Sequence, residues 1–481
     1  MAAKRTDVGA PERAGAMRRR DFFAIMGAGA AGLFARGLYT AGGGATGALV
    51  GAPQPNIIVI LADDQGYADL GCQGAKDVAT PHIDSLAAGG VRFTNGYVSG
   101  PVCSPTRAGL MTGRYQQRFG HEFNPGRSAA AYETVGLPLS QITIADALKQ
   151  AGYATGIVGK WHLGWAPKFH PLRRGFDELF GFLGGSHSYL DAKADPLDPI
   201  LRGTEAVDEK EYLTDAFTRE AVSFISRHKD HPFFLYLAYN AVHAPLQATE
   251  KYLGRFAHIA DPKRSTYAAM LAAMDDGAGA VLRRLREDGL ERDTMVFFFS
   301  DNGGPIGVNG SDNSPLSGAK GTVLEGGIRV PFILQWPERV PAGKVYDEPV
   351  ISLDVFPTAV AAARGGVPRD RVMDGVDIIP YVTGAAKGRP HETLFWRSGE
   401  QRAVRRGQWK LVRAAGAPPA LYDLSRDIGE RQDLAKDQPQ LAQELDQALG
   451  KWESQLAPPL WGRPAQPAGR RRQRAPAASR P

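Results

Sequence analysis

Four short and nearly unbroken apolar runs constrain the fold of this 481-residue chain more than any other feature. They are rich in β-branched and aromatic side chains and lie at residues 56–61, 232–237, 295–299 and 330–334. Runs of this kind predict strands buried on both faces of a largely parallel sheet. Helical patterns lie between them, for example at residues 144–151, 215–228 and 267–288. The alternation predicts an α/β sandwich with a large, mostly parallel central sheet flanked by helices.

The pattern changes from about residue 391 onward. Short strand-like segments separated by turns occupy residues 393–397, 403–405, 409–413 and 420–423, and a helical pattern follows at 438–455. They predict a small antiparallel sheet with a helix. We therefore divide the chain into a leader (1–52), a large domain (53–386), a small C-terminal subdomain (387–457) and a basic tail (458–481). The tail is rich in Pro, Ala and Arg and is predicted to be disordered.

Positive charge is concentrated at the two ends of the chain. The formal net charge is +6, yet residues 1–50 carry seven Lys or Arg against three acids, and residues 460–481 carry six Arg and no acid. The body between them is therefore mildly acidic. A nucleic-acid-binding core needs a basic face to neutralise phosphates, so nucleic acid is not an expected partner.

The N-terminal leader contains a run of arginines, Arg18-Arg19-Arg20, followed by Asp21, Phe22 and a weakly apolar stretch that ends at Arg36. This pattern resembles a twin-arginine export signal. The apolar stretch is shorter than the roughly 20 residues that a spanning helix needs, so a stable membrane anchor is not expected. The interpretation predicts a periplasmic or secreted protein that uses the twin-arginine export machinery, and Met17 could be its true start. The alternative is a disordered basic leader.

Acidic motifs follow two of the predicted strands. Asp63-Asp64 closes the run at 56–61, and Asp301-Asn302 closes the run at 295–299. Ligand sites in open α/β sheets collect at the carboxyl ends of strands. Three carboxylates and an amide oxygen form a hard oxygen shell that suits Ca²⁺ or Mg²⁺. The sequence therefore predicts a divalent metal site at this edge of the sheet.

The segment Cys103-Ser104-Pro105-Thr106-Arg107 continues into a Leu-x-Thr-Gly-Arg tail that ends at Arg114. Proline suits the first turn of a helix, so residues 105–112 are predicted to begin a helix whose N-terminus points at Cys103. Free N–H groups at a helix N-terminus favour a bound anion. The whole segment resembles the signature of type I sulfatases, the formylglycine-dependent enzymes.

That resemblance implies a specific chemistry for Cys103. In the family a separate maturation enzyme oxidises the cysteine to formylglycine, an aldehyde whose hydrate attacks sulfur with one hydroxyl. Deprotonation of the second hydroxyl then expels sulfate without water having to attack sulfur. The resemblance also implies that Asp63, Asp64, Asp301 and Asn302 bind the metal together with the modified Cys103, that the ion is usually calcium, and that Arg107 holds the modified side chain.

Three further segments match the family in order. Residues 152–162 resemble its second signature and imply that Lys160 binds a sulfate oxygen and that His162 orients or deprotonates the diol. His243, in residues 240–245, matches a histidine near the leaving-group oxygen and could act as general acid there. Lys320, in a glycine-rich segment, matches a second sulfate-binding lysine, while Glu325 and Arg329 are expected to pair structurally. His187 could line the pocket or be an ordinary polar surface residue.

The resemblance spans residues 54–457 and implies an alkaline-phosphatase-like fold. It implies hydrolysis of an organic sulfate ester, an aryl sulfate or a sulfated sugar, to an alcohol and inorganic sulfate. The matching segments are most similar to arylsulfatases and N-acetylgalactosamine-6-sulfatases. One alternative is a phosphonate monoester or phosphodiester hydrolase of the same fold. Others are a catalytically silent glycan-binding protein and a hydrolase that uses Cys103 as a thiolate. The other cysteine, Cys72, is predicted to be a small buried residue.

Overall fold

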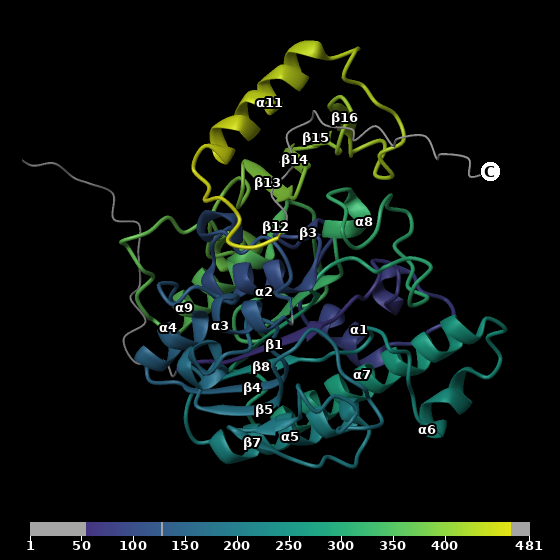
Figure 1. The fold of residues 1–481 in the computed structure, drawn as a ribbon, viewed down its shortest axis with the longest axis vertical. Helices are drawn as coiled ribbons and strands as arrows, with labels where there is room; N and C mark the ends of the chain where they lie inside the picture. Colours follow the sequence, from purple (N-terminus) through teal and green to yellow (C-terminus); the bar gives the residue numbers. More distant parts are fainter. Residues whose placement is uncertain (1–53, 127, 463–481) are drawn as a thin grey trace, which may run out of the picture. The chain divides into compact units, whose positions relative to one another are not determined.

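The computed structural model describes residues 54–462, apart from residue 127. The predicted export leader (1–52) and residues 463–481 of the predicted tail lie outside the described residues. In the part that is described, ten strands form one mixed sheet (Figure 1). In spatial order they are β11 (Lys344–Tyr346), β2 (Val91–Phe93), β10 (Phe332–Gln335), β9 (Thr294–Ser300), β1 (Asn56–Ala62), β8 (Phe233–Ala238), β4 (Ala154–Lys160), β5 (Glu178–Phe182), β6 (Leu201–Arg202) and β7 (Glu205–Ala206).

The middle of this sheet is parallel, as the sequence predicted. β1 pairs in parallel with both β8 and β9, β8 pairs with β4, and β4 pairs with β5. Every residue of β1, β8 and β9 is buried. Alternate side chains of β1 enter two different apolar clusters, Ile57 and Val59 on one face and Ile58 and Ile60 on the other. Burial on both faces explains why these strands are apolar without a polar alternation.

The fourth apolar run forms an antiparallel strand instead. β10 pairs antiparallel with β9 on one side and with β2 on the other. The chain between β9 and β10 contains only the four-residue helix α8 (Glu325–Ile328) among its described helices. A parallel neighbour requires a crossover that returns the chain to the starting edge, usually through a longer helix. Without that return, β10 starts near the end at which β9 stops and runs the opposite way.

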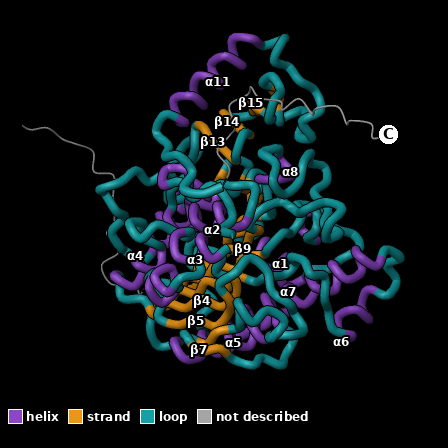
Figure 2. Tube along the Cα trace, in the orientation of Figure 1, coloured by secondary structure: helices purple, strands orange, loops and turns teal. Residues whose placement is uncertain are grey.

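Helices cover both faces of the sheet (Figure 2). One face packs against α1 (Pro81–Ala88), α5 (Leu213–His228), α6 (Glu250–Leu253) and α7 (Pro262–Glu287). The other packs against α2 (Cys103–Thr112), α4 (Ile144–Gln150) and α9 (Val355–Ala362). The described helices also include α3 (Ala129–Thr134) and α10 (Ile379–Thr383). α7 begins five residues earlier than the sequence pattern predicted, because Asp261 caps the Lys263 N–H and Pro262 occupies the first turn.

The C-terminal strands form a separate four-stranded antiparallel sheet, as predicted. It consists of β13 (Thr393–Ser398), β14 (Gln401–Arg406), β15 (Trp409–Arg413) and β16 (Ala420–Asp423), and α11 (Pro439–Glu453) contacts β14 and β15. A two-stranded sheet pairs β3 (Gly96–Tyr97) with β12 (Val350–Ile351). Trp396 of β13 is fully buried in the same apolar cluster as β1, and its Nε1 donates to the Val98 carbonyl at 2.8 Å. The small sheet therefore shares its core with the large one.

Two details differ from the sequence-based expectations. Cys72 is half-buried rather than buried, because it lies in a short surface turn. The first residues of the predicted tail are held by the fold: the Leu460 N–H donates to the Gly120 carbonyl, and the Trp461 ring lies edge-on to His121. Among the described residues, no helix combines the length and the apolar character that crossing a bilayer requires.

Candidate active site

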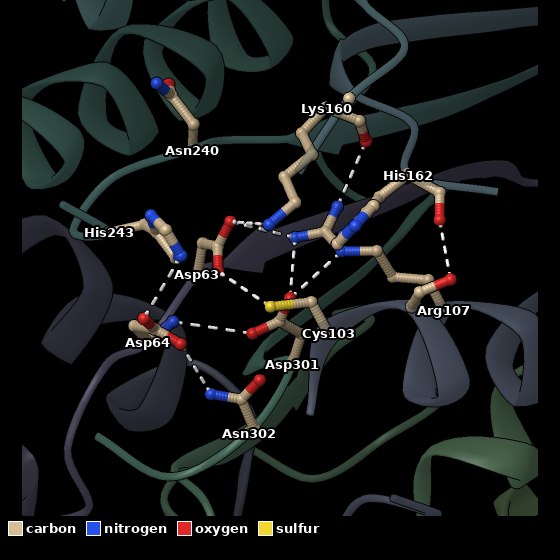
Figure 3. A network of polar contacts seen from close by, with 12 residues as sticks. Asp63, Asp64, Cys103, Arg107, Lys160, His162, Asn240, His243, Asp301 and Asn302 are labelled. Carbon is tan, nitrogen blue, oxygen red and sulfur yellow. Dashed lines mark hydrogen bonds and ion pairs between the residues drawn. The ribbon is translucent and has the colours of Figure 1, made fainter. Parts of the chain in front are cut away.

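Polar side chains from distant parts of the chain meet at the carboxyl ends of the central strands (Figure 3). β1 and β9 are aligned so that Ala62 pairs with Ser300, the last residue of each strand. The residues that follow, Asp63-Asp64 and Asp301-Asn302, therefore emerge side by side. Lys160 is the last residue of β4, two strands away from β1. The topology of the sheet thus brings together residues that lie more than 200 positions apart.

The acidic centre contains the two aspartates after β1 and the pair after β9. The Asn302 Nδ2 donates to Asp64 Oδ1 at 2.7 Å, and the Asp64 N–H donates to Asp301 Oδ1 at 3.4 Å. The Asn302 Oδ1 is buried and has no hydrogen-bond partner among the described residues. Ligand atoms of Asp63, Asp64, Cys103 and His243 all lie within 4.8 Å of one another. Carboxylates with a free, buried amide oxygen fit a hard divalent cation.

Three cations lie against these carboxylates. Arg107 donates to Asp301 Oδ2 through Nε at 2.9 Å and Nη2 at 2.8 Å. Lys160 Nζ lies 2.5 Å from Asp63 Oδ2, and Lys320 Nζ lies 2.6 Å from Asp64 Oδ1. Charges this deeply buried require partners, since an unpaired buried ion is strongly destabilising. The three carboxylates and three cations therefore form a balanced cluster.

The pKa values of Asp63 and Asp301, the two carboxylates nearest Arg107, are shifted in opposite directions. Burial alone would raise the pKa of Asp63, but the surrounding cations, chiefly Lys160, hold its pKa well below the ordinary value. Burial raises the pKa of Asp301, and the neighbouring negative charge of Asp63 adds to this shift despite Arg107. Two adjacent carboxylates disfavour double ionisation. A divalent cation among them would remove this repulsion.

Cys103 is the first residue of α2, and its side chain faces the acidic centre. Its Sγ lies 3.6 Å from Asp63 Oδ1, and Lys320 Nζ donates to it at 3.3 Å. All ten residues of α2 are buried, so the thiol is hidden in the folded chain. Burial, reinforced by Asp301, raises the pKa of the thiol to about 12. Such a thiol is a poor nucleophile, which argues against the thiolate alternative.

The two predicted histidines differ in their surroundings. His243 follows β8; its Nδ1 contacts the Ala244 carbonyl at 2.6 Å, and its Nε2 lies 3.5 Å from Asp64 Oδ2. Its side chain keeps 21% of its surface exposed, so it lies at the open side of the cluster. His162 is buried, and its pKa is held well below the ordinary value by burial and by Lys160. Ser104, next to Cys103, donates to the His162 carbonyl at 2.6 Å.

All the sequence-predicted site residues thus lie in or beside one cluster. His187 is different: it is 3% exposed, its Nδ1 contacts the Ser188 carbonyl, and its ring packs on Phe182. It is therefore not the polar surface residue that one interpretation predicted. Glu325 pairs with Arg329 at 3.3 Å, as the sequence predicted.

Two residues near the centre were not predicted. Tyr236 lies within β8, and its hydroxyl accepts from Arg107 Nη1 at 3.5 Å. Asn309 donates from Nδ2 to the Asp64 carbonyl at 3.1 Å and to the Val242 carbonyl at 3.2 Å. A tyrosine in an apolar strand and an asparagine in a loop have ordinary structural explanations. No sequence signal singled them out.

Comparison with known proteins identifies the family of the chain. A family model described as Sulfatase matches residues 55–366, and one described as N-sulphoglucosamine sulphohydrolase, C-terminal, matches residues 319–455. The chain belongs to the sulfatase family. Members of this family typically need a metal ion and a formylglycine. The prediction of an alkaline-phosphatase-like sulfatase fold is confirmed.

Curated relatives of this sulfatase are themselves sulfatases. The N-acetylgalactosamine-6-sulfatase of Mus musculus is 38% identical over 383 residues, covering 75% of this chain and 72% of its own. Arylsulfatase D of Homo sapiens is 33% identical over 499 residues, covering 80% of this chain and 83% of its own. These relatives confirm the prediction that the protein is a sulfuric ester hydrolase.

Solved structures agree with this assignment. The crystal structure of Ps i-CgsB, also solved in complex with k-i-k-neocarrahexaose, matches with a TM-score of 0.81 and 39% identity, over 85% of this chain and 94% of that one. The Phosphonate Monoester Hydrolase of Agrobacterium radiobacter matches with a TM-score of 0.62 at 20% identity, which shows a shared fold alone. The sulfatase interpretation is therefore favoured over the phosphonate alternative.

Proposed function

We propose that this sulfatase hydrolyses the sulfate ester of a sulfated sugar through a formylglycine made from Cys103. The observation that carries the proposal is the position of Cys103. It begins α2 and contacts both Asp63 of the acidic centre and the ammonium group of Lys320. A sulfate ester placed here would meet the positive end of the α2 dipole and two lysines, although the Ser104 N–H itself donates to Asn124 Oδ1 at 3.0 Å.

Four residues are proposed to hold the metal ion together with the modified side chain of Cys103: Asp63, Asp64, Asp301 and Asn302. The free Asn302 Oδ1 supports this assignment, because a buried amide oxygen without a partner is costly unless a cation occupies its lone pairs. Oxygen ligands suit both Ca²⁺ and Mg²⁺, and the resemblance to the family favours Ca²⁺. When bound, the cation would polarise the sulfate and offset developing negative charge.

The remaining residues are assigned roles from their positions. Lys160 and Lys320 are proposed to bind sulfate oxygens as point charges, and Arg107 to orient the Cys103 side chain from one helical turn away. The buried His162 stays uncharged at neutral pH, the form that accepts a proton from a hydroxyl at position 103. The more exposed His243 is proposed to donate a proton to the leaving oxygen.

The chemistry at position 103 explains why an aldehyde is useful. The hydrated aldehyde would offer one hydroxyl to accept the sulfuryl group and a second whose deprotonation releases sulfate. Maturation requires access to a thiol that the folded chain buries, so a formylglycine-generating enzyme is expected to act before folding. The arginine-rich leader supports export to the periplasm by the twin-arginine route, which carries folded proteins.

Release of inorganic sulfate tests the proposed function. Matured protein is incubated with an aryl sulfate, with N-acetylgalactosamine 6-sulfate and with a phosphonate monoester. We expect sulfate release from the sulfated sugar and a higher kcat/KM for sulfate esters than for the phosphonate. A protein whose Cys103 is demonstrably converted, but which prefers the phosphonate, would refute the proposal.

The variant His243→Ala is expected to separate substrates by their leaving groups. Loss of a general acid typically costs about 10²- to 10⁴-fold, and we expect this loss in kcat for a sugar sulfate, whose alkoxide must be protonated. With a nitrophenyl sulfate the loss should stay below about tenfold, since nitrophenolate leaves without a proton. Steady-state kinetics on both substrates measure the difference. His258→Ala, at an exposed histidine, is the matched control. Equal losses on both substrates would contradict the assigned role.

A further inference from the structure

The loop that carries Lys320 is held by the C-terminal sheet. Lys320 lies between β9 and α8, outside the described helices and strands. Its Nζ nevertheless reaches both Cys103 Sγ, at 3.3 Å, and Asp64 Oδ1, at 2.6 Å. A lysine side chain has many accessible rotamers, so a fixed ammonium position requires a well-held backbone. The contacts that hold this backbone therefore bear on the site.

The peptide that follows Lys320 is clamped from two directions. The Gly321 N–H donates to the carbonyl of Pro101, two residues before Cys103, at 2.8 Å. The Gly321 carbonyl accepts from the Nε2 of Gln401, the first residue of β14, at 2.8 Å. Gly321 has a φ of +89°, which residues with a side chain rarely adopt. One of these two hydrogen bonds thus comes from the segment that precedes Cys103, and the other comes from the C-terminal sheet.

Gln401 also contacts the loop further along. The Val323 N–H donates to Gln401 Oε1 at 3.4 Å. The amide group of Gln401 therefore donates to one loop residue and accepts from another. Gln401 itself is only half-buried, so replacing it leaves no apolar cavity in the core.

The two ends of the same loop are tied to the C-terminal part of the chain. Ser317 Oγ donates to the Gly429 carbonyl at 2.5 Å, and the Glu325 N–H donates to Glu430 Oε2 at 2.7 Å. Lys410 of β15 lies 2.8 Å from both Glu325 Oε1 and Glu430 Oε1, and all three side chains are fully buried. These contacts fix the ends of the loop, while Gln401 holds its middle, next to Lys320.

We propose that Gln401 is a positioning residue for Lys320, so that the C-terminal sheet is part of the catalytic apparatus. The proposal rests on the sulfate-binding role proposed for Lys320. Gln401 does not touch the acidic centre; it acts through the backbone of Gly321 and Val323. Without it, the loop would keep its ends, the bond from the Gly321 N–H to Pro101 and the bond from the Lys320 N–H to the Gly304 carbonyl at 3.3 Å. It would lose the two contacts that the C-terminal sheet makes to the peptides on either side of residue 322, next to the lysine.

Kinetics of Gln401→Ala provide the first test. We expect kcat/KM for sulfate esters to fall about tenfold, mainly through KM, as loss of a positioning hydrogen bond predicts. The melting temperature should change by less than about 4 °C, since only two hydrogen bonds of a half-buried side chain are lost. Gln401→Glu keeps the acceptor for Val323 but cannot donate to Gly321, and we expect it to be impaired as well. Gln408→Ala, at an exposed glutamine in the turn between β14 and β15, is the matched control and should behave as wild type.

A double-mutant cycle with Lys320→Ala distinguishes two roles for Gln401: positioning of Lys320, and general stabilisation of the fold. If Gln401 acts through Lys320, Gln401→Ala should have no further effect once the lysine side chain is removed. Effects that multiply in the double variant would overturn the inference, as would wild-type kinetics of Gln401→Ala, and both would leave the role of Lys320 intact. An unchanged rate of Lys320→Ala alone would refute the proposed role of Lys320, and this inference with it.

Discussion

Replacing Cys103 with serine is expected to lower steady-state turnover by a factor on the order of 10⁵ or more, the scale seen when a catalytic nucleophile is removed. A serine hydroxyl at the start of α2 could still accept a sulfuryl group. It lacks the second hydroxyl whose deprotonation would expel sulfate, so the enzyme should stop after one sulfation. Cys103→Ala should be inactive from the first turnover.

Intact-protein mass after incubation with substrate measures this difference. Cys103→Ser should gain the mass of one SO₃ group, and Cys103→Ala should gain nothing. Cys72→Ser is the matched control, because the other cysteine is half-buried in a surface turn and should leave turnover unchanged. If Cys103→Ser turned over substrate at the wild-type rate, the covalent mechanism would be refuted.

The peptide that contains Cys103 reports the modification directly. The tryptic peptide of residues 93–107, taken from active protein, should have lost the thiol and gained an aldehyde oxygen. An unmodified Cys103 in active protein that iodoacetamide inactivates would revive the thiolate alternative. The same peptide in inactive protein would identify a host that lacks the maturation enzyme.

Removal of the divalent cation is expected to reduce activity below about 1% of the starting value, since the ion would stabilise several kcal/mol of transition-state charge. The melting temperature should fall at the same time, because a ligand that binds only the folded state stabilises it by mass action. Added Ca²⁺ should restore both quantities more effectively than Mg²⁺. The loss of activity and stability is expected because Asp63, Asp64 and Asp301 converge in a buried space, where burial and the negative charge of Asp63 raise the pKa of Asp301.

Chelator dialysis followed by calcium titration measures activity and melting temperature together. Asp64→Ala should lose the calcium response, and Asn302→Ala should shift it to higher calcium concentration. Asp312→Asn, at an exposed aspartate of the neighbouring loop, should respond as wild type. Full activity of the chelated protein with no bound cation would contradict the metal site.

Much of the fold followed from local patterns. The apolar runs of β1, β8 and β9 were recognisable because strands buried on both faces have no polar alternation. The C-terminal strands β15 and β16 begin and end at the predicted residues. The direction of β10 was not recognisable, because it depends on the path of the preceding loop rather than on the composition of the strand.

The residues of the candidate site also divide into those that the sequence predicted and those that only the structure revealed. Cys103 was found through the resemblance of its segment to the sulfatase signature, and the acidic motifs were found because they lie at the ends of predicted strands. Lys410 and Gln401 were missed for the opposite reason. A lysine or a glutamine in a short antiparallel strand ordinarily faces solvent, and Lys410 is fully buried only because Glu325 and Glu430 meet it there.

The sequence by itself determined which residues are candidates for the chemistry and which ends of strands and helices hold them. These features are local, because a strand end or a helix start is specified by its own neighbours. Only the tertiary structure decided how they meet: the register that places Asp63 beside Asp301, the salt bridge from Arg107, and the reach of the C-terminal sheet to the Lys320 loop. Such contacts join segments far apart in the chain, and hydrogen bonds between distant segments leave no periodic trace in the sequence.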